Sequence, residues 1–439
     1  MAAPKQSAKP LVAPGAQPPG AMRPAAIMGG LGRGFRALRI RNYRLFWTGQ
    51  LFSLTGTWMQ ATAQDWLVLQ LTHSPFALGL VATLQFLPVT LLSLHGGVIA
   101  DMWSKRKLLF VTQLLGLIQA LIFGILVATG AIQIWHIYVL AGSQGIVNAL
   151  SNPTRQAFAV ELVGRAEVVN AVALNSMLFN AARIVGPAAA GLLIWLVGIA
   201  PALFINAASF IAILIALVMM DESQLFYNAS GRQARSSRNI REGLSYAWHT
   251  PVVLAVLIVV GMVGTFGYNF SVVLPLLAGF VLHTNAAGFG GLTSFLGFGS
   301  LLGAISTAYT SKITLRRLLI GAGFFSIVFA LLAFSSIFAV SAVLLVAMGF
   351  AGVTFGTTAN SLIQMTVPDE LRGRVMGLYV LLFMGSTPVG SFFIGTVSNF
   401  IGVTETLLIC AALCAIGVGI ALVYRKRMGA SLAEASVLS

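Results

Sequence analysis

The chain has 439 residues, of which 58% are hydrophobic and only 8% charged, and its formal net charge is +15. Because a soluble domain carries roughly 25% charged residues, this composition excludes an ordinary soluble globular protein. Apolar stretches of about 20 residues, each long enough to cross a hydrocarbon core of roughly 30 Å, recur along the sequence. The composition therefore predicts an all-α membrane protein that crosses the bilayer many times.

In chain order, residues 1–42 are rich in Pro, Ala, Gly and basic residues, and we expect a disordered N-terminal tail. Residues 43–220 are expected to form a six-helix bundle, 221–250 a cytoplasmic linker, 251–424 a second six-helix bundle, and 425–439 a cytoplasmic C-terminal tail. The twelve predicted transmembrane helices lie at 46–70, 76–100, 108–129, 133–153, 168–193, 198–220, 252–281, 287–309, 316–336, 338–360, 375–399 and 403–424.

Two sets of six helices around a polar linker suggest an internal duplication. A shift of 204 residues superposes Gly186 on Gly390 and Gly191 on Gly395, within segments of similar sequence. Two parallel six-helix repeats with a binding site between them are a known plan for transporters. We therefore expect two pseudo-repeats.

The basic residues follow the predicted topology. All Lys and Arg residues except Arg183 lie in the two tails or in alternate loops, and the loops between those carry neither. This positive-inside pattern places both termini in the cytoplasm of a multi-pass protein, expected in the inner membrane. It also accounts for the positive net charge through contact with anionic lipid headgroups, so a nucleic-acid partner is not indicated.

Enzyme signatures are missing from the sequence. There is no P-loop, no His/Cys cluster with zinc spacing and no nucleophile elbow. Cys410 and Cys414 lie four residues apart within a predicted span, where a structural disulfide is not expected. The sequence predicts a protein that is not an enzyme and holds neither metal nor cofactor.

A short charged loop joins the second and third predicted helices. It contains Gly97 and Asp101, four residues apart, followed by three consecutive cations at 105–107. This pattern resembles the loop between helices 2 and 3 of the major facilitator superfamily, although Met102 and Ser104 stand where that family usually has arginine and glycine.

Three further stretches are similar to the enterobactin-exporter-like and macrolide-efflux-like branch of that superfamily: GTWMQ and QDWLV at 56–60 and 64–68, NPTRQAF at 152–158, and RIVGP at 183–187. The resemblance implies an exporter that uses alternating access and is driven by the proton gradient. We expect a monomer that moves a hydrophobic or amphipathic small molecule, drug-like or siderophore-like, by proton antiport. An importer or facilitator of the same fold is one alternative. A transport-dead receptor or scaffold is another.

The resemblance also implies a gate. Asp101 would meet the cytoplasmic end of helix 11 near Arg374, or it would simply cap a helix in a solvated loop. Gly186-Pro187 is either a hinge or a site of close helix packing. The candidate gating residues are Gly97, Asp101, Lys105, Arg106, Gly186, Pro187 and Arg374.

Charged residues within predicted spans are rare and are candidates for function. Arg183 lies about 24 Å from the cytoplasmic edge of its helix and Asp65 about 30 Å, at 1.5 Å per residue. We predict that they pair, the alternative being that Asp65 faces water at the outer mouth. Asp65 is also the first candidate for proton coupling. His95 is the second, with a structural hydrogen-bonding role as its alternative.

In the resembling family the substrate path is lined by helices 1, 4, 7 and 10. On these helices the sequence places uncharged amides and aromatic residues, which would suit a large amphipathic solute with little charge. The candidates are Trp58, Gln60, Gln64, Gln144, Asn148, Tyr268, Asn269 and Asn360.

Overall fold

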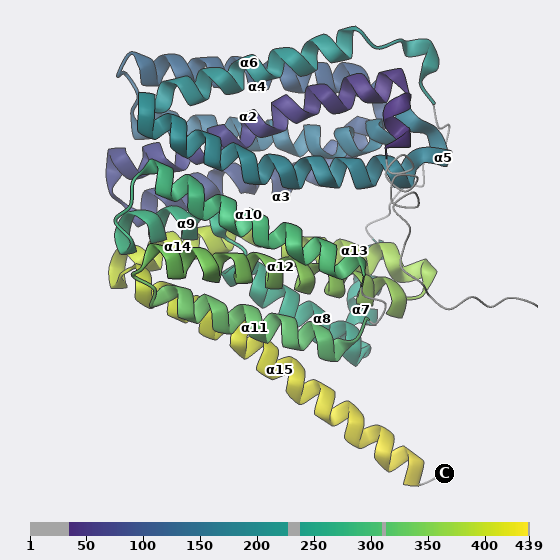
Figure 1. Ribbon diagram of the computed structural model, residues 1–439. Coiled ribbons are helices and arrows are strands. Elements are labelled where there is room, and N and C mark those ends of the chain that lie inside the picture. The colour runs from purple at the N-terminus through teal and green to yellow at the C-terminus, as the bar shows by residue number, and fades with distance from the viewer. Residues whose placement is uncertain (1–34, 227–237, 310–312, 438–439) are drawn as a thin grey trace, which may run out of the picture.

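The computed structural model describes residues 35–226, 238–309 and 313–437, and Figure 1 shows their arrangement. The side chains of 93–98, 100–101, 238–241 and 426–437 lie outside that description. Within the described ranges the secondary structure is entirely helical. The expected all-α class is therefore confirmed for this part of the chain.

The N-terminal half forms the upper layer of Figure 1, coloured purple to teal. Its elements are η1 (Arg36–Arg39), α2 (Arg41–Thr72), α3 (Pro75–Met102), α4 (Lys105–Ala128), α5 (Ile134–Val197), α6 (Ile199–Val218) and η2 (Glu222–Gln224).

The C-terminal half forms the lower layer, coloured teal to yellow. Its elements are α7 (Arg238–His249), α8 (Pro251–Met262), η3 (Val263–Gly267), α9 (Phe270–Leu276), η4 (Leu277–Val281), α10 (Ala286–Ala308), α11 (Leu315–Ala333), α12 (Phe338–Thr366), α13 (Asp369–Phe383), α14 (Thr387–Ile401) and α15 (Val403–Val437).

Several helix starts are fixed by side chains that accept hydrogen bonds from backbone N–H groups in the first turn, which have no partner within the helix. The Ser74 hydroxyl accepts from the Ala77 amide before Pro75 opens α3, and Asn285 accepts from Gly288 at the start of α10. Thr314 does the same for Arg317 at the start of α11. Such caps stabilise a helix by about 1 kcal/mol and set where each crossing begins.

Each of the twelve predicted segments contains a helix, but the breaks between them differ from the prediction. Residues 154–167 were expected to form a loop, whereas α5 runs through them with one interruption at Gly164, whose φ is +65°. Glycine adopts this left-handed region without a steric penalty. At 1.5 Å per residue the 64 residues of α5 would extend about 96 Å, far more than a single crossing requires.

By length and composition, ten helical segments of the described residues could cross a membrane. The number is ten rather than twelve for two reasons. Helix α5 covers two predicted spans but is one segment, and α2 is not among the segments that meet the hydropathy requirement. Three buried glutamines, Gln50, Gln60 and Gln64, lie on α2 and reduce its hydropathy.

All three predicted tail and linker segments contain helix as well: η1 and the first residues of α2 lie within the predicted disordered tail at 1–42, of which residues 1–34 are outside the described ranges. The linker carries α7, and α15 extends to Val437 through the region expected to be a tail.

The two halves contact each other through two pairs of helices. Helix α3 packs against α14, and α5 packs against α10, as the adjoining layers in Figure 1 show. We call this contact between the halves the seam. Smaller contacts between the halves join α2 and α3 to α9, and α2 to α10.

Candidate functional site

The seam is closed by glycines that bring backbones into direct contact. A Cβ added to Gly79 of α3 would lie 2.7 Å from the Gly395 Cα of α14, and one added to Gly191 of α5 would lie 2.9 Å from the Gly290 Cα of α10. Real Cβ atoms essentially never come within 3.0 Å of such atoms. Only glycine therefore fits at these two crossings.

Hydrogen bonds reinforce both sides of the seam. The Thr83 hydroxyl of α3 is 3.2 Å from the Pro388 carbonyl oxygen of α14, and the Ser294 hydroxyl of α10 donates to the Ile184 carbonyl at 2.7 Å. Gly79 is only four residues from the start of α3, and Gly191 is six residues from the end of α5. The tightest contacts thus lie toward one end of the molecule. We call it the opposite end, because it lies opposite the end that carries the basic residues.

The other end, which we call the basic end, is held by ion pairs. Lys105 Nζ is 2.6 Å from Glu161 Oε1, and Arg106 Nη1 is 2.5 Å from Glu222 Oε1, both within the N-terminal half. Arg374 pairs with Glu242 of the linker helix α7. The sequence analysis did not identify these glutamates, because none lies near its partner in the sequence.

The predicted contact between Asp101 and Arg374 lies outside the described residues, because the Asp101 side chain is not among them. In this conformation Arg374 binds Glu242, while the side chains of His95, Gly97 and Asp101 lie outside the described residues. The backbone of these three residues belongs to the last turns of α3. Their gating and proton-coupling roles therefore stay predictions.

Carboxamides form a buried network inside the N-terminal half. Asn206 donates to Gln60 at 2.7 Å, Gln60 donates to Gln119 at 2.9 Å, and Gln119 donates to the Leu140 carbonyl at 3.4 Å. Four helices are thereby joined without any charge. Gln60 is 5% exposed and has both ends of its amide occupied within this half, so it does not line an open path as predicted.

A small cavity of about 30 Å³ adjoins this amide network. Such a volume exceeds the roughly 10–15 Å³ that one water needs. Four predicted path residues, Gln60, Gln64, Gln144 and Asn148, line it together with Gln85. Gln64 donates to Gln85, and Gln144 to Asn148. These residues lie inside the N-terminal bundle, because helix rotation turns them toward their own half.

The first crossing of the C-terminal half is broken near its middle. After α8 the chain makes a π-turn at Val263–Gly267, leaves helical geometry at Tyr268 and Asn269, and resumes as α9. π-turns of this kind are frequent at functional sites. Asn269 is fully buried, donates to the Thr265 carbonyl and accepts from Ser391 of α14. Its amide therefore ties two helices together rather than facing a path.

A second break lies alongside the first. Helix α13 ends at Phe383 and α14 starts at Thr387. A Cβ added to Gly264 in the π-turn would lie 2.7 Å from the Leu382 carbonyl oxygen, so the two breaks are adjacent. The Thr90 hydroxyl of α3 is 3.4 Å from the Gly385 carbonyl oxygen at the second break, which joins it to the other half. Paired discontinuous helices mark substrate sites in many transporters.

Aromatic rings surround the break. The Tyr268 ring is 4.8 Å from that of Phe383 and 6.2 Å from that of Phe325, while Tyr379 stacks on Phe383 at 5.7 Å. The Tyr379 hydroxyl donates to the Gly356 carbonyl. Asn360 of α12, which is half-buried and accepts from Gln364, is within hydrogen-bonding reach of Tyr379. The C-terminal half thus offers aromatic surface where the N-terminal half has amides.

Arg183 of α5 lies across the seam from Tyr268, close enough for the two to interact electrostatically. Its Nε is buried without a hydrogen-bond partner. One turn further along α5, Gly186 packs against Trp58 of α2, whose ring contacts Phe179 edge-on at 5.8 Å. Arg183 and Tyr268 therefore meet between the two halves, and Trp58 packs one turn along α5 from Arg183.

The predicted ion pair between Arg183 and Asp65 is absent from this structure. Neither residue has a salt bridge to any described residue. Arg183 lies 14 residues from the end of α5 and Asp65 seven residues from the end of α2, which puts them at depths of about 21 Å and 10 Å from the same end. The prediction measured both depths from the expected cytoplasmic starts of the two helices, and these starts differ in the structure.

Gly186-Pro187 had two interpretations, and the geometry matches close packing. A Cβ added to Gly186 would lie 2.6 Å from the Trp58 Cβ, and helical geometry continues through both residues. No hinge is visible here in this conformation.

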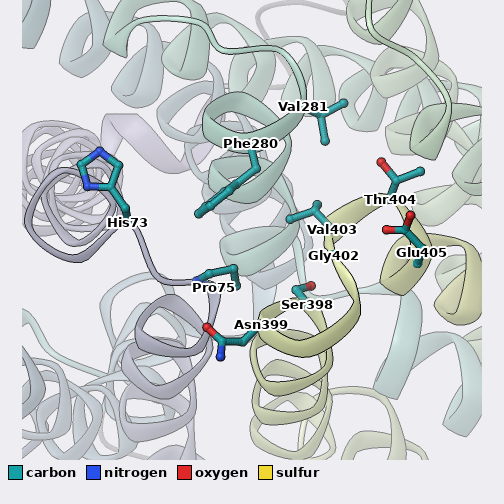
Figure 2. A pocket seen from close by; sticks show the side chains of 10 residues that line it. All are labelled: His73, Pro75, Phe280, Val281, Ser398, Asn399, Gly402, Val403, Thr404 and Glu405. Carbon is teal, nitrogen blue, oxygen red and sulfur yellow. The ribbon is translucent and has the colours of Figure 1, made fainter.

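A larger pocket of about 450 Å³ opens at the opposite end (Figure 2). It lies between the α2–α3 connection and the turn before α15. Figure 2 labels its lining residues, which are His73, Pro75, Phe280, Val281, Ser398, Asn399, Gly402, Val403, Thr404 and Glu405. Both halves contribute to this pocket, so a movement of the seam would reshape it.

A bundle of membrane-length helices, joined by a seam that closes mainly at one end, is the architecture of a secondary transporter. Comparison with known proteins agrees. A family described as transmembrane secretion effector matches residues 33–438. The chain belongs to this family of the major facilitator superfamily, and the membrane transporters of that family are not enzymes.

Two relatives cover most of the chain. The multidrug efflux pump Tap of Mycolicibacterium fortuitum is 28% identical over 372 residues, which is 80% of this chain and 88% of that protein. The staphyloferrin A transporter of Staphylococcus aureus is 24% identical over 381 residues, covering 83% and 92%.

The fold is shared with solved transporters. The nucleoside transporter NupG superposes with a TM-score of 0.68 at 12% identity, covering 88% of this chain and 99% of that one. A bacterial homolog of the human lysosomal transporter Spinster gives 0.68 at 12% identity, covering 88% and 97%.

Proposed function

We propose that this protein exports an amphipathic small molecule across the inner membrane by alternating access and proton antiport. One observation carries the proposal: the close contacts between the halves lie toward the opposite end, while the ion pairs at the basic end join elements within one half or to the linker. Such a seam can open only by separating glycine contacts at one end and forming new contacts at the other.

The halves are proposed to be two six-helix repeats, with twelve crossings in total. Matching contacts support this. Gly186 packs on α2 beside Thr55 and Trp58, and Gly390, 204 residues later, packs beside Thr265 and Asn269. In each half, therefore, the fifth predicted helix approaches the first at a glycine.

The basic end is proposed to face the cytoplasm, together with both termini. The positive-inside distribution of Lys and Arg supports this orientation, and the cations would also contact anionic headgroups. The described conformation would then be inward-facing. We propose that the protein acts as a monomer, since one chain supplies both halves of the seam.

Asp65 is proposed to carry the proton. It is half-buried on α2, has no hydrogen bond or ion pair to the described residues, and lies one residue from Trp66, which stacks on Phe289 of the other half at 5.8 Å. A carboxyl at the closed end of the seam would meet external water when that end opens. A proton taken up there could leave on the other side after the seam closes.

The test uses proteoliposomes that contain a pH-sensitive dye and a fluorescent amphiphile such as dansylglycinamide. With an imposed pH gradient, the wild type should move the dansyl compound and protons in opposite directions. Asp65→Asn should abolish the proton flux, whereas Glu405→Gln, which changes an exposed carboxylate at the same end, should not.

The outcomes separate the alternatives. Dansyl flux without proton flux would indicate a facilitator. No flux of dansylglycinamide, of its acid analogue or of its amine analogue would contradict export and favour a receptor or scaffold.

A further inference from the structure

Arg183 is a charged side chain for which the described residues supply no hydrogen-bonding or ionic partner. No hydrogen bond or salt bridge joins its guanidinium to any described residue, and its Nε is buried. Asp65, the other charge at this seam, lies about 10 Å away in depth along the helices. The cation therefore stands alone at the seam.

An unpaired cation within a membrane is expensive. Insertion scales assign at least about 2.5–3.5 kcal/mol to an arginine at mid-membrane, and such residues normally find a partner. The remaining cations of the described chain lie in or next to its connecting segments, apart from Arg155, which donates to Asn152. Arg155 also has a buried Nε without a partner, but it hydrogen-bonds to Asn152 through another nitrogen, whereas Arg183 makes no hydrogen bond to a described residue. A counter-charge for Arg183 could therefore be supplied by a bound solute.

The surroundings of Arg183 would hold an apolar body beside the anion. On one side stand Tyr268 and Phe383, whose rings are 4.8 Å apart. Trp58 of α2 packs on Gly186, one helical turn along α5 from Arg183. The adjacent helix breaks at 263–269 and 384–386 lie behind these rings.

We infer that the transported molecule is an organic anion, an amphiphile whose carboxylate or equivalent acidic group binds the Arg183 guanidinium while its apolar part packs against Tyr268, Phe383 and Trp58. Guanidinium and carboxylate match in a two-pronged, charge-assisted geometry. This inference rests on the proposed transport function, since it assigns the substrate class of the same seam.

The experiment measures binding in detergent, where no transport is needed. Three dansyl probes share one fluorophore: dansylglycine is an acid, dansylglycinamide is neutral, and dansyl-ethylenediamine is a cation. Wild-type protein should bind dansylglycine about ten- to a hundredfold more tightly than the amide, the range expected for one charge-assisted contact. Binding of the amine should be the weakest.

Three variants identify the residue responsible. Arg183→Gln should bind acid and amide equally, and Arg183→Lys should retain part of the preference because it keeps the charge. Arg316→Gln removes the same charge from an exposed position on α11 and should behave as wild type. Thermal unfolding of each variant checks that it is folded. If Arg183→Gln is not folded, the comparison of acid and amide binding is made with Arg183→Lys.

The inference is overturned if wild-type protein shows no preference for the acid, binds none of the probes, or keeps its preference after Arg183→Gln. A loss of transport with an intact acid preference would instead count against the proposed export function alone. The two results can therefore be told apart.

Discussion

Gly79 of α3 lies directly against Gly395 of α14, so closely that a Cβ added to Gly395 would come within 2.6 Å of the Gly79 Cα. The same arrangement recurs between Gly191 and Gly290 on the other side of the seam. The opposite end can therefore close only because all four positions are glycine, since a side chain at any of them would push the two backbones apart.

Replacing Gly395 with leucine should open the seam. Overpacking of this kind costs about 1–3 kcal/mol in the closed conformation, which shifts the equilibrium about fivefold or more. A cysteine at Leu69, which contacts Gly279 across the seam, should then react faster with a membrane-impermeant maleimide. Gly419→Leu, at an exposed glycine with open space around it, should leave the rate unchanged. Equal rates in both variants would show that Gly395 does not control closure.

The Lys105–Glu161 ion pair should contribute more to stability than the Arg106–Glu222 pair. The Glu161 side chain that Lys105 binds is only 10% exposed, so Lys105→Met leaves a largely buried carboxylate unpaired. We expect a loss of about 1–3 kcal/mol, most of it recovered in Lys105→Met/Glu161→Met. Glu222→Gln removes a partner that is 56% exposed and should cost at most about 1 kcal/mol. Thermal unfolding in detergent measures all three, and equal losses for the two pairs would contradict the ranking.

The linker helix α7 should detach from α13 when Glu242 is changed. Its ion pair with Arg374 joins the two helices, and Gly243 packs on the same arginine. In Glu242→Ala, limited proteolysis of the linker should be severalfold faster, and the reversed pair Glu242→Arg/Arg374→Glu should restore protection. Asp369→Ala breaks a pair with Arg372 that is local to α13, and it should have no effect on the linker.

The amide network should tolerate the loss of one member at a modest cost. Gln60→Met removes an acceptor for Asn206 and a donor for Gln119. Hydrogen bonds between membrane helices contribute about 0.6 kcal/mol on average and about 1.7 at most, so a loss in the range of about 1–2 kcal/mol is expected. Gln364→Met, at an exposed position on α12, is the control. A loss above about 4 kcal/mol would mean that Gln60 does more than join helices.

Sequence reasoning predicted the helical segments well, because hydrophobic length is set by the membrane and is visible in the chain. It placed a loop at 154–167 because polar residues such as Glu161 and Arg165 occur there, whereas one glycine at 164 is enough to redirect α5.

The sites were harder to predict for a physical reason. Periodicity assigns Gln60 and Gln64 to the right helix but not to a face, and tertiary packing turns both toward partners in their own half. The partners of Lys105 and Arg374 could not be found in the sequence, since each lies more than 50 residues away. Trp58, Arg183 and Tyr268 were identified individually, but only the fold brings them together.

The network of Asn206, Gln60 and Gln119 has one more consequence. Carboxamides neither gain nor lose protons at physiological pH, so a change in acidity cannot rearrange this network. A response of this half to a proton gradient would therefore begin at a titratable group outside the network, such as Asp65.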